Sequence, residues 1–202
     1  MKKKPISLLL FFFPYFAFSS CDSSFTYFSE LPNNVTILVG DTCLSNSDID
    51  VLDSLISQND LEYNSPLELG TQTWFNGRLR FLVAGNYGNS SGVNDTIFSL
   101  PDNFGDLTSL ASLYLEWNRI SILPESFSEL SSLASVYLNN NRITSLGDNI
   151  GNLTNLFFLD VGYNELEFIP ESICSLVNLS YFWLFNNNLT FLPDCFCGME
   201  LD

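Results

Sequence analysis

The most regular feature of the chain is an apolar pattern that repeats every 23 residues between residues 107 and 196. The first two columns of this pattern are Leu107, Leu130, Leu153, Leu176 and Leu110, Leu133, Leu156, Leu179. In each row, two apolar residues then alternate with their neighbours, as Leu113 and Leu115 do, which predicts a short strand with one buried face. Such a strand buries its apolar face only by stacking on neighbouring strands, so the period predicts a solenoid.

An asparagine follows the strand in each of these rows, at Asn118, Asn141, Asn164 and Asn187. The chain turns away from the strand at this point, and an amide side chain can bond to backbone groups that the turn leaves unpaired. Four asparagines in one column are too regular to be ordinary surface residues. We therefore expect them to form a ladder through the stack.

The complete pattern, LxxLxLxxNxLxxLPxxIxx, resembles the leucine-rich repeat family in its 23-residue class. The resemblance implies an α/β-type solenoid, an arc with a short parallel β-sheet on the concave face. An earlier, irregular repeat is expected because five residues match the same frame, namely Phe75, Arg78, Phe81, Val83 and Asn86. An insertion around residues 87–95, with a loop-like composition, separates this repeat from the next. The array then has about five repeats over residues 75–197.

Residues 1–20 have the composition of a secretory leader, with a charged start at Lys2–Lys4 and a short, proline-broken apolar run. The segment Phe18–Cys21 resembles a bacterial lipobox, which implies lipidation of Cys21 and a lipoprotein of the cell surface or outer membrane. A lipid tethers a protein to the membrane without a spanning helix. The alternative is ordinary cleavage near Ser20, which leaves Cys21 as a plain thiol and the protein freely secreted.

The segment between leader and repeats divides into two parts. Residues 21–47 are rich in polar residues and are predicted to be a tether with one strand at Val35–Val39. Residues 48–74 are predicted to cap the solenoid, since residues 48–58 have the pattern of an amphipathic helix and the first coil needs a cover. The three aspartates of this helix lack the glycine and distal glutamate of a calcium loop, so no metal site is expected. Residues 198–202 are left as a tail.

The composition excludes several classes of function. With 46% apolar residues the chain can build a core, and its net charge of −16 becomes −19 without residues 1–20, which hold all three lysines. So acidic a protein repels the phosphates of nucleic acids. The chain has no histidine, which excludes Ser-His and Cys-His catalysis and histidine-metal sites. We expect no cofactor and no enzymatic activity.

Five cysteines behind a secretory leader indicate an oxidising compartment. Cys174 and Cys197 occupy the same column of consecutive rows, and neighbouring strands lie roughly 5 Å apart, which a disulfide can bridge. We therefore predict a Cys174–Cys197 disulfide, with Cys174–Cys195 as the alternative. If Cys21 is lipidated, Cys43 has no evident partner.

The expected concave face is rich in aromatic residues, because alternate strand residues point away from the core. Together with three polar residues, eight aromatic side chains form the predicted ligand contacts: Tyr114, Glu116, Trp117, Tyr137, Asn139, Phe158, Asp160, Tyr163, Tyr181, Trp183 and Phe185. Exposed aromatic clusters are typical of recognition surfaces. The family resemblance implies a protein or peptide ligand outside the cytoplasm. Stacking of sugar rings on Tyr137, Tyr181 and Trp183 is the alternative.

Overall fold

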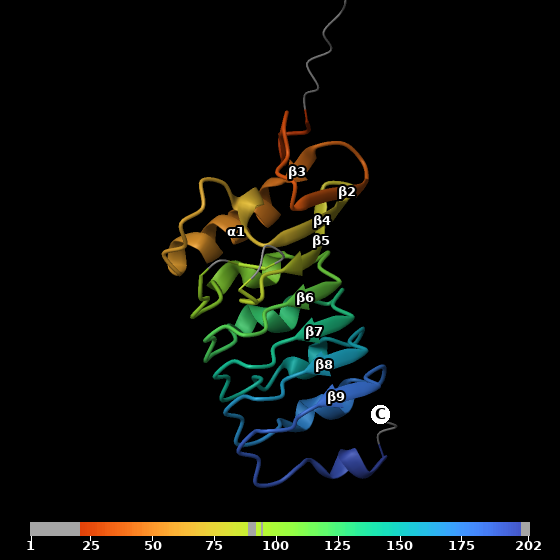
Figure 1. The fold of residues 1–202 in the computed structure, drawn as a ribbon. Coiled ribbons are helices and arrows are strands. Elements are labelled where there is room, and N and C mark those ends of the chain that lie inside the picture. Colours follow the sequence, from red (N-terminus) through yellow and green to blue (C-terminus); the bar gives the residue numbers. More distant parts are fainter. Residues whose placement is uncertain (1–20, 89–91, 94, 199–202) are drawn as a thin grey trace, which may run out of the picture.

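The computed structural model describes residues 21–88, 92–93 and 95–198. The coils stack in one direction, with a seven-stranded sheet on one side and 3-10 turns on the other (Figure 1). The predicted leader, residues 1–20, lies outside the described residues, as do the last four residues of the predicted tail. Within the described part, no helix is long and apolar enough to cross a bilayer.

The repeating part of the sheet consists of short parallel strands that pair without any shift in register. These strands are β6 (Ser112–Tyr114), β7 (Ser135–Tyr137), β8 (Phe158–Asp160) and β9 (Tyr181–Trp183). The central residue of each strand is buried, and the residues on either side of it face away from the core. The predicted leucine-rich repeat fold, with its parallel sheet, is confirmed.

The opposite, convex side of each coil is a 3-10 turn instead of a full α-helix. These turns are η2 (Asp102–Asp106), η3 (Glu125–Glu129), η4 (Ile150–Asn152), η5 (Glu171–Ser175) and η6 (Asp194–Gly198). Where Pro124 and Pro170 stand at the N-cap, the turn has five residues. Where the row has Gly147 in place of proline, the turn has three.

The asparagine ladder is present as predicted, and Asn141 shows its geometry. Its amide nitrogen donates to the carbonyl of Leu138 in its own coil at 3.0 Å and to that of Leu115 in the preceding coil at 2.9 Å. Its amide oxygen accepts from the N–H of Ile120 at 3.0 Å. The same arrangement recurs at Asn118, Asn164 and Asn187. The ladder thus satisfies the backbone groups that each turn exposes.

The N-terminal end of the stack is covered by the expected helix, α1 (Asn46–Gln58), whose apolar face is buried (Figure 1). The buried carboxylate of Asp48 fixes this helix to the sheet. It forms an ion pair with Arg78, at 2.8 Å between Oδ1 and Nη2, and accepts from the N–H of Leu79 at 2.7 Å. The hydrogen bonds that the Arg78 guanidinium donates to the Asp48 carboxylate raise the pKa of Arg78. Removal of either partner would leave a buried charge unpaired.

The lead-in to the repeats holds more structure than the tether expected over residues 21–47. In addition to the predicted strand β2 (Val35–Val39), it contains β1 (Phe25–Tyr27) and β3 (Cys43–Ser45), which pair with each other. The remaining elements are the turn η1 (Pro66–Glu68) and the antiparallel strands β4 (Thr71–Phe75) and β5 (Arg78–Val83), which continue the sheet.

The first repeat is shifted by one residue from the predicted frame. Phe81 and Val83 were expected in the core, but β5 pairs with β6 so that Leu82 and Ala84 are buried and Phe81 is exposed. The stretch 81–84 is apolar throughout, so alternation does not distinguish its two faces. Asn86 is consequently not part of the ladder, and its side chain bonds to Thr96 instead.

A disulfide between Cys21 and Cys43 closes the N-terminal segment, with 5.7 Å between the two Cα atoms. This pairing contradicts the predicted lipidation of Cys21, because a sulfur atom in a disulfide is not free to carry a thioether. It also gives Cys43 the partner that the sequence did not reveal.

The second disulfide joins Cys174 to Cys195, with 5.8 Å between the Cα atoms, and Cys197 is free and exposed. The predicted Cys174–Cys197 bridge is therefore wrong, and the alternative pairing is the one found. In the last coil, the ring centroids of Phe196 and Phe182 lie 5.8 Å apart. Cys195 and Cys197 are the residues directly before and after Phe196 in the sequence. Two disulfides indicate an oxidising, extracytoplasmic compartment.

Candidate ligand-binding face

The outward side of β6 to β9 is a continuous aromatic surface. The rings of Tyr114 and Tyr137 stack with their centroids 4.4 Å apart and their planes 9° apart. Tyr137 is 4.6 Å from Phe158, which in turn is 5.0 Å from Trp183 in an edge contact and 5.9 Å from Tyr181. Because neighbouring strands place these residues side by side, the sheet holds the rings in fixed positions.

The C-terminal part of this surface is the most exposed. The side chains of Tyr163, Trp183 and Phe185 are 50%, 43% and 48% exposed, and the ring of Phe185 contacts the other two. Gly162 permits this packing, because an added Cβ would lie 2.8 Å from Cε2 of Phe185. A side chain at this position would therefore displace the Phe185 ring.

One outward column has unusual backbone geometry in every coil. Trp117, Asn140, Tyr163 and Asn186 have φ values of 60°, 58°, 53° and 55°, in the left-handed region. Asparagine visits this region readily, whereas a bulky aromatic residue rarely does. Trp117 nevertheless stands there with a side chain that is 57% exposed and therefore gains little from burial. Strain of this kind, in a residue that packs little, is characteristic of a functional surface.

Two carboxylates lie among the rings. Burial raises the pKa of Glu116 and the pKa of Asp160. The hydrogen bond from Tyr87 opposes this shift at Glu116, and the hydrogen bond from the Gly162 N–H opposes it at Asp160. The Tyr87 hydroxyl donates to Glu116 Oε2 at 2.5 Å, and the Gly162 N–H donates to Asp160 Oδ1 at 2.9 Å. Asn139 lies between them on β7's coil, with its side chain partly exposed. The face thus combines rings with hydrogen-bond acceptors.

All eleven predicted contact residues lie outside the core on this side of the stack, although Asp160 is only 5% exposed among its neighbours. Sequence reasoning missed Phe81 and Tyr87. Phe81 was placed in the core by the one-residue shift described above. Tyr87 was assigned to a flexible insertion, yet its ring lies where an added Cβ at Gly85 would be, 2.4 Å from Tyr87 Cζ. The sequence signal for this close packing of Tyr87 was its position between two glycines, Gly85 and Gly92.

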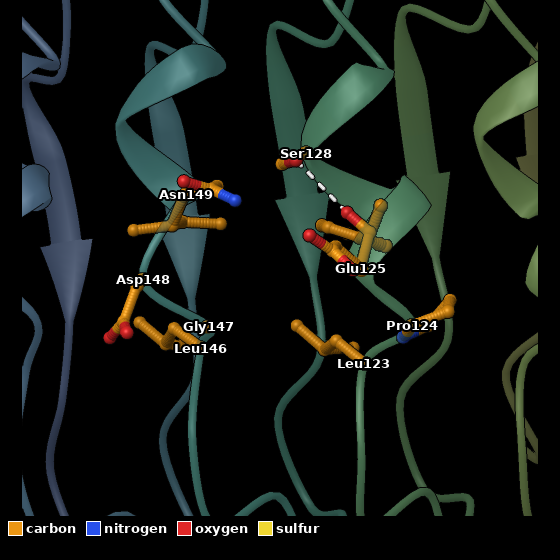
Figure 2. A pocket seen from close by; sticks show the side chains of 10 residues that line it. Leu123, Pro124, Glu125, Ser128, Leu146, Gly147, Asp148 and Asn149 are labelled. Atoms are coloured by element: carbon orange, nitrogen blue, oxygen red, sulfur yellow. Dashed lines mark hydrogen bonds between the residues drawn. The ribbon is translucent and has the colours of Figure 1, made fainter.

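The convex side offers a different kind of cavity. A depression of about 290 Å³ lies between the turns η3 and η4. Figure 2 shows the side chains that line it. Glu125 and Ser128 line it from one coil, and Gly147 and Asp148 line it from the next. It forms because Gly147, at φ 79°, replaces the proline of the other rows and shortens η4. Phe127, the aromatic residue that lines this depression, is buried.

Comparison with known proteins agrees with this architecture. The sequence matches the leucine rich repeat family model over residues 98–143 and again over residues 131–189. Residues 98–189 therefore consist of leucine-rich repeats. This repeat domain has a non-enzymatic, ligand-binding fold. No curated protein matches the sequence.

Solved structures similar to this chain include proteins from bacteria and plants. A leucine-rich repeat protein of Leptospira interrogans is 29% identical with a TM-score of 0.49, and the match covers 61% of this chain and 33% of that one. The leucine-rich repeat ectodomain of the receptor kinase SOBIR1 from Arabidopsis thaliana gives a TM-score of 0.63 at 19% identity, covering 79% and 90%. A plant ice-binding protein gives 0.60 at 22% identity, covering 72% and 50%. The two plant structures support the fold alone.

Proposed function

We propose that this protein is an extracytoplasmic binding module that recognises a protein or peptide through the aromatic concave face. The observation that carries the proposal is the unbroken series of ring contacts from Tyr114 to Trp183. These rings pack on one another outside the core. Aromatic side chains fixed in this way offer a large contact area at little entropic cost on binding, which is typical of interface residues that dominate affinity.

The ring geometry favours a peptide over a carbohydrate. A sugar stacks on a free ring face, but Tyr137 is stacked against Tyr114 and against Phe158, with ring centroids 4.4 Å and 4.6 Å away. Its edge and hydroxyl group are what a ligand meets. Edges and hydroxyls suit the hydrogen bonds and apolar side chains of a polypeptide. Trp183 keeps an exposed ring, so a carbohydrate is retained as the second candidate.

A double substitution tests the concave face. We expect Tyr137→Ala with Trp183→Ala to abolish binding while the chain stays folded, because both side chains lie outside the core. Wild type and variant, each immobilised, are compared by selection from a displayed random-peptide library and on a glycan array. The matched control, Phe168→Ala with Phe191→Ala, removes two exposed rings beside the turn η5 and is expected to select the same peptides as wild type.

Two results would reject the peptide proposal. Equal selection of peptides by wild type and the concave variant would place the site elsewhere on the surface. A signal on the glycan array, without any peptide selection, would replace a peptide ligand by a carbohydrate.

We further propose that residues 1–20 direct secretion and are removed by ordinary cleavage near Ser20. The Cys21–Cys43 disulfide supports this route, since it leaves no thiol at residue 21 for a lipid. Mass spectrometry of the mature N-terminus is the test. A mass that includes acyl chains on residue 21 would contradict the proposal.

A further inference from the structure

Asp160 occupies a position on the concave face that is otherwise aromatic. It lies on β8 directly between Tyr137 on β7 and Trp183 on β9, its partners in the two strand ladders. Phe158 completes the surroundings, with its ring 4.6 Å from that of Tyr137 and 5.0 Å from that of Trp183. We call Tyr137, Phe158, Asp160 and Trp183 the carboxylate box.

The carboxylate in this box lacks a positive partner. Its Oδ1 accepts one hydrogen bond from the N–H of Gly162, and the side chain is 5% exposed. Among residues 21–88, 92–93 and 95–198, the ion pair present joins Arg78 to Asp48 in the N-terminal cap. Asp160 takes part in no ion pair among these residues. A negative charge so far removed from water is costly unless a cation compensates for it. A basic group on a ligand would supply that cation.

The exposed ring of Trp183 adds to the attraction for positive charge. The face of an aromatic ring is electronegative, and a cation between that ring and the carboxylate gains from both. A second carboxylate, Glu116, stands on the same face two coils earlier, roughly 10 Å away by strand spacing. The whole chain has a net charge of −16, so the long-range field attracts cationic ligands as well.

We propose that the carboxylate box binds a lysine or arginine side chain of a peptide that lies along the concave face. This inference rests on the proposed function, and it specifies the ligand class as basic. The charge complementarity between the acidic carboxylate box and a basic peptide carries it. Peptides with basic residues are expected to bind, and the pairing is expected to weaken with added salt.

Selection from a displayed random 12-residue peptide library, on three immobilised proteins, tests the inference. Wild type is expected to enrich peptides that contain lysine or arginine. Asp160→Asn is expected to lose that enrichment, because the amide still accepts the Gly162 N–H but carries no charge. Asp148→Asn makes the same substitution at an exposed position on the convex side, where Figure 2 labels the residue, and is expected to behave as wild type.

A selected arginine peptide and its citrulline counterpart, a neutral analogue, then give the size of the effect. We expect the affinity of wild type for the citrulline peptide to be about tenfold lower, from the strength of one cation–aromatic and ion-pair contact. Asp160→Asn is expected to bind both peptides with the same lower affinity. Thermal unfolding of each protein shows that the substitutions leave the fold intact.

The outcomes separate this inference from the proposed function. Peptides selected without enrichment of basic residues, or with equal enrichment on Asp160→Asn, would overturn the cation site. If the Tyr137→Ala and Trp183→Ala variant still failed to select those peptides, the concave binding face would stand. Failure of wild type to select any peptide would overturn both.

Discussion

The two faces of the same short strands follow opposite rules. On the inward face, each coil repeats the chemistry of the last, as Leu115, Leu138 and Val161 do, and these residues are fully buried. On the outward face, the chemistry changes from coil to coil, as Tyr137 and Asp160 show. Repetition is what stacking requires, since each coil must fit its neighbours. Variation along the outward face is what recognition of a particular ligand requires.

Three consecutive asparagines show this division at single-residue resolution. Asn139 faces outward and is partly exposed, Asn140 has φ 58° at the turn, and Asn141 is buried in the ladder. The residues are chemically identical, and only their place in the coil differs. The contribution of a side chain to stability is therefore set by which face it occupies. Substitutions one position apart can break or sharpen this comparison.

The largest expected effect comes from a charge placed on the inward face. Leu138→Asp buries an unpaired carboxylate and should destabilise the fold by about 4 kcal/mol or more, enough to unfold a marginally stable domain. Asn139→Asp, one residue away, adds the same charge on the outward face and should leave the fold intact. Far-UV circular dichroism of the two variants is the measurement. A folded Leu138→Asp protein would show that the strand register is wrong.

The next effect concerns the ladder. Asn141→Ala removes the partners of the Ile120 N–H and of the Leu115 and Leu138 carbonyls, and should cost about 3 kcal/mol, since each buried polar group left unpaired costs about 1–3 kcal/mol. Asn139→Ala serves as the control and should change the free energy of unfolding by less than about 0.5 kcal/mol. Urea unfolding gives both values. Equal effects at the two positions would remove the distinction between structural and surface asparagine.

A substitution on the outward face is expected to act in the opposite direction. Trp117→Asn replaces a strained residue at φ 60° by one that tolerates this region, and should stabilise the fold by about 1 kcal/mol. The same change should weaken ligand binding, because the exposed ring is lost. Urea unfolding and the peptide selection measure the two effects. A destabilised Trp117→Asn protein would mean that the tryptophan serves packing rather than recognition.

The inward face was predictable from the sequence, and most of the outward face followed from it. The positions of Leu113, Leu138 and Asn141 each recur every 23 residues, and the period alone assigns the strands, the buried positions and the ladder. Once the inward residues of β6 to β9 are fixed, their neighbours must face outward. The period therefore assigns the inward and outward positions of β6 to β9 without information on the ligand.

The regions that the sequence did not predict correctly are those where the period fails. In the stretch containing Phe81 and Leu82, both faces are apolar, so the register was set one residue away from the observed pairing with β6. The choice between Cys195 and Cys197 depends on how the last turn is oriented, which spacing alone does not determine. The position of Tyr87 depends on the contact of two glycine-containing segments, and a single sequence does not reveal that contact.

The smallest expected effect is a pH dependence that arises from two carboxylates of the outward face. Burial raises the pKa of Glu116 and of Asp160, while Tyr87 and the Gly162 N–H oppose this in part. Among the groups that face them, Asp160 raises the pKa of Glu116, and both carboxylates raise the pKa of Tyr137. Since the folded-state pKa values exceed those of the unfolded chain, the native state binds more protons above the ordinary carboxyl pKa. The free energy of unfolding should therefore increase as the pH falls from about 7 to about 5, because the two carboxyl groups take up protons more readily in the folded state.

The variant Glu116→Gln with Asp160→Asn isolates this contribution from the other carboxylates. Urea unfolding of wild type and variant at the two pH values gives the difference, and wild type should gain stability on acidification relative to the variant. Removal of Glu125 and Asp148, two exposed carboxylates of the convex depression, should leave the wild-type response unchanged. An identical response in wild type and the outward-face variant would mean that Glu116 and Asp160 are as well solvated in the folded protein as in the unfolded chain. The buried, unpaired charge proposed for the carboxylate box would then be lost, whereas the aromatic surface around it would remain.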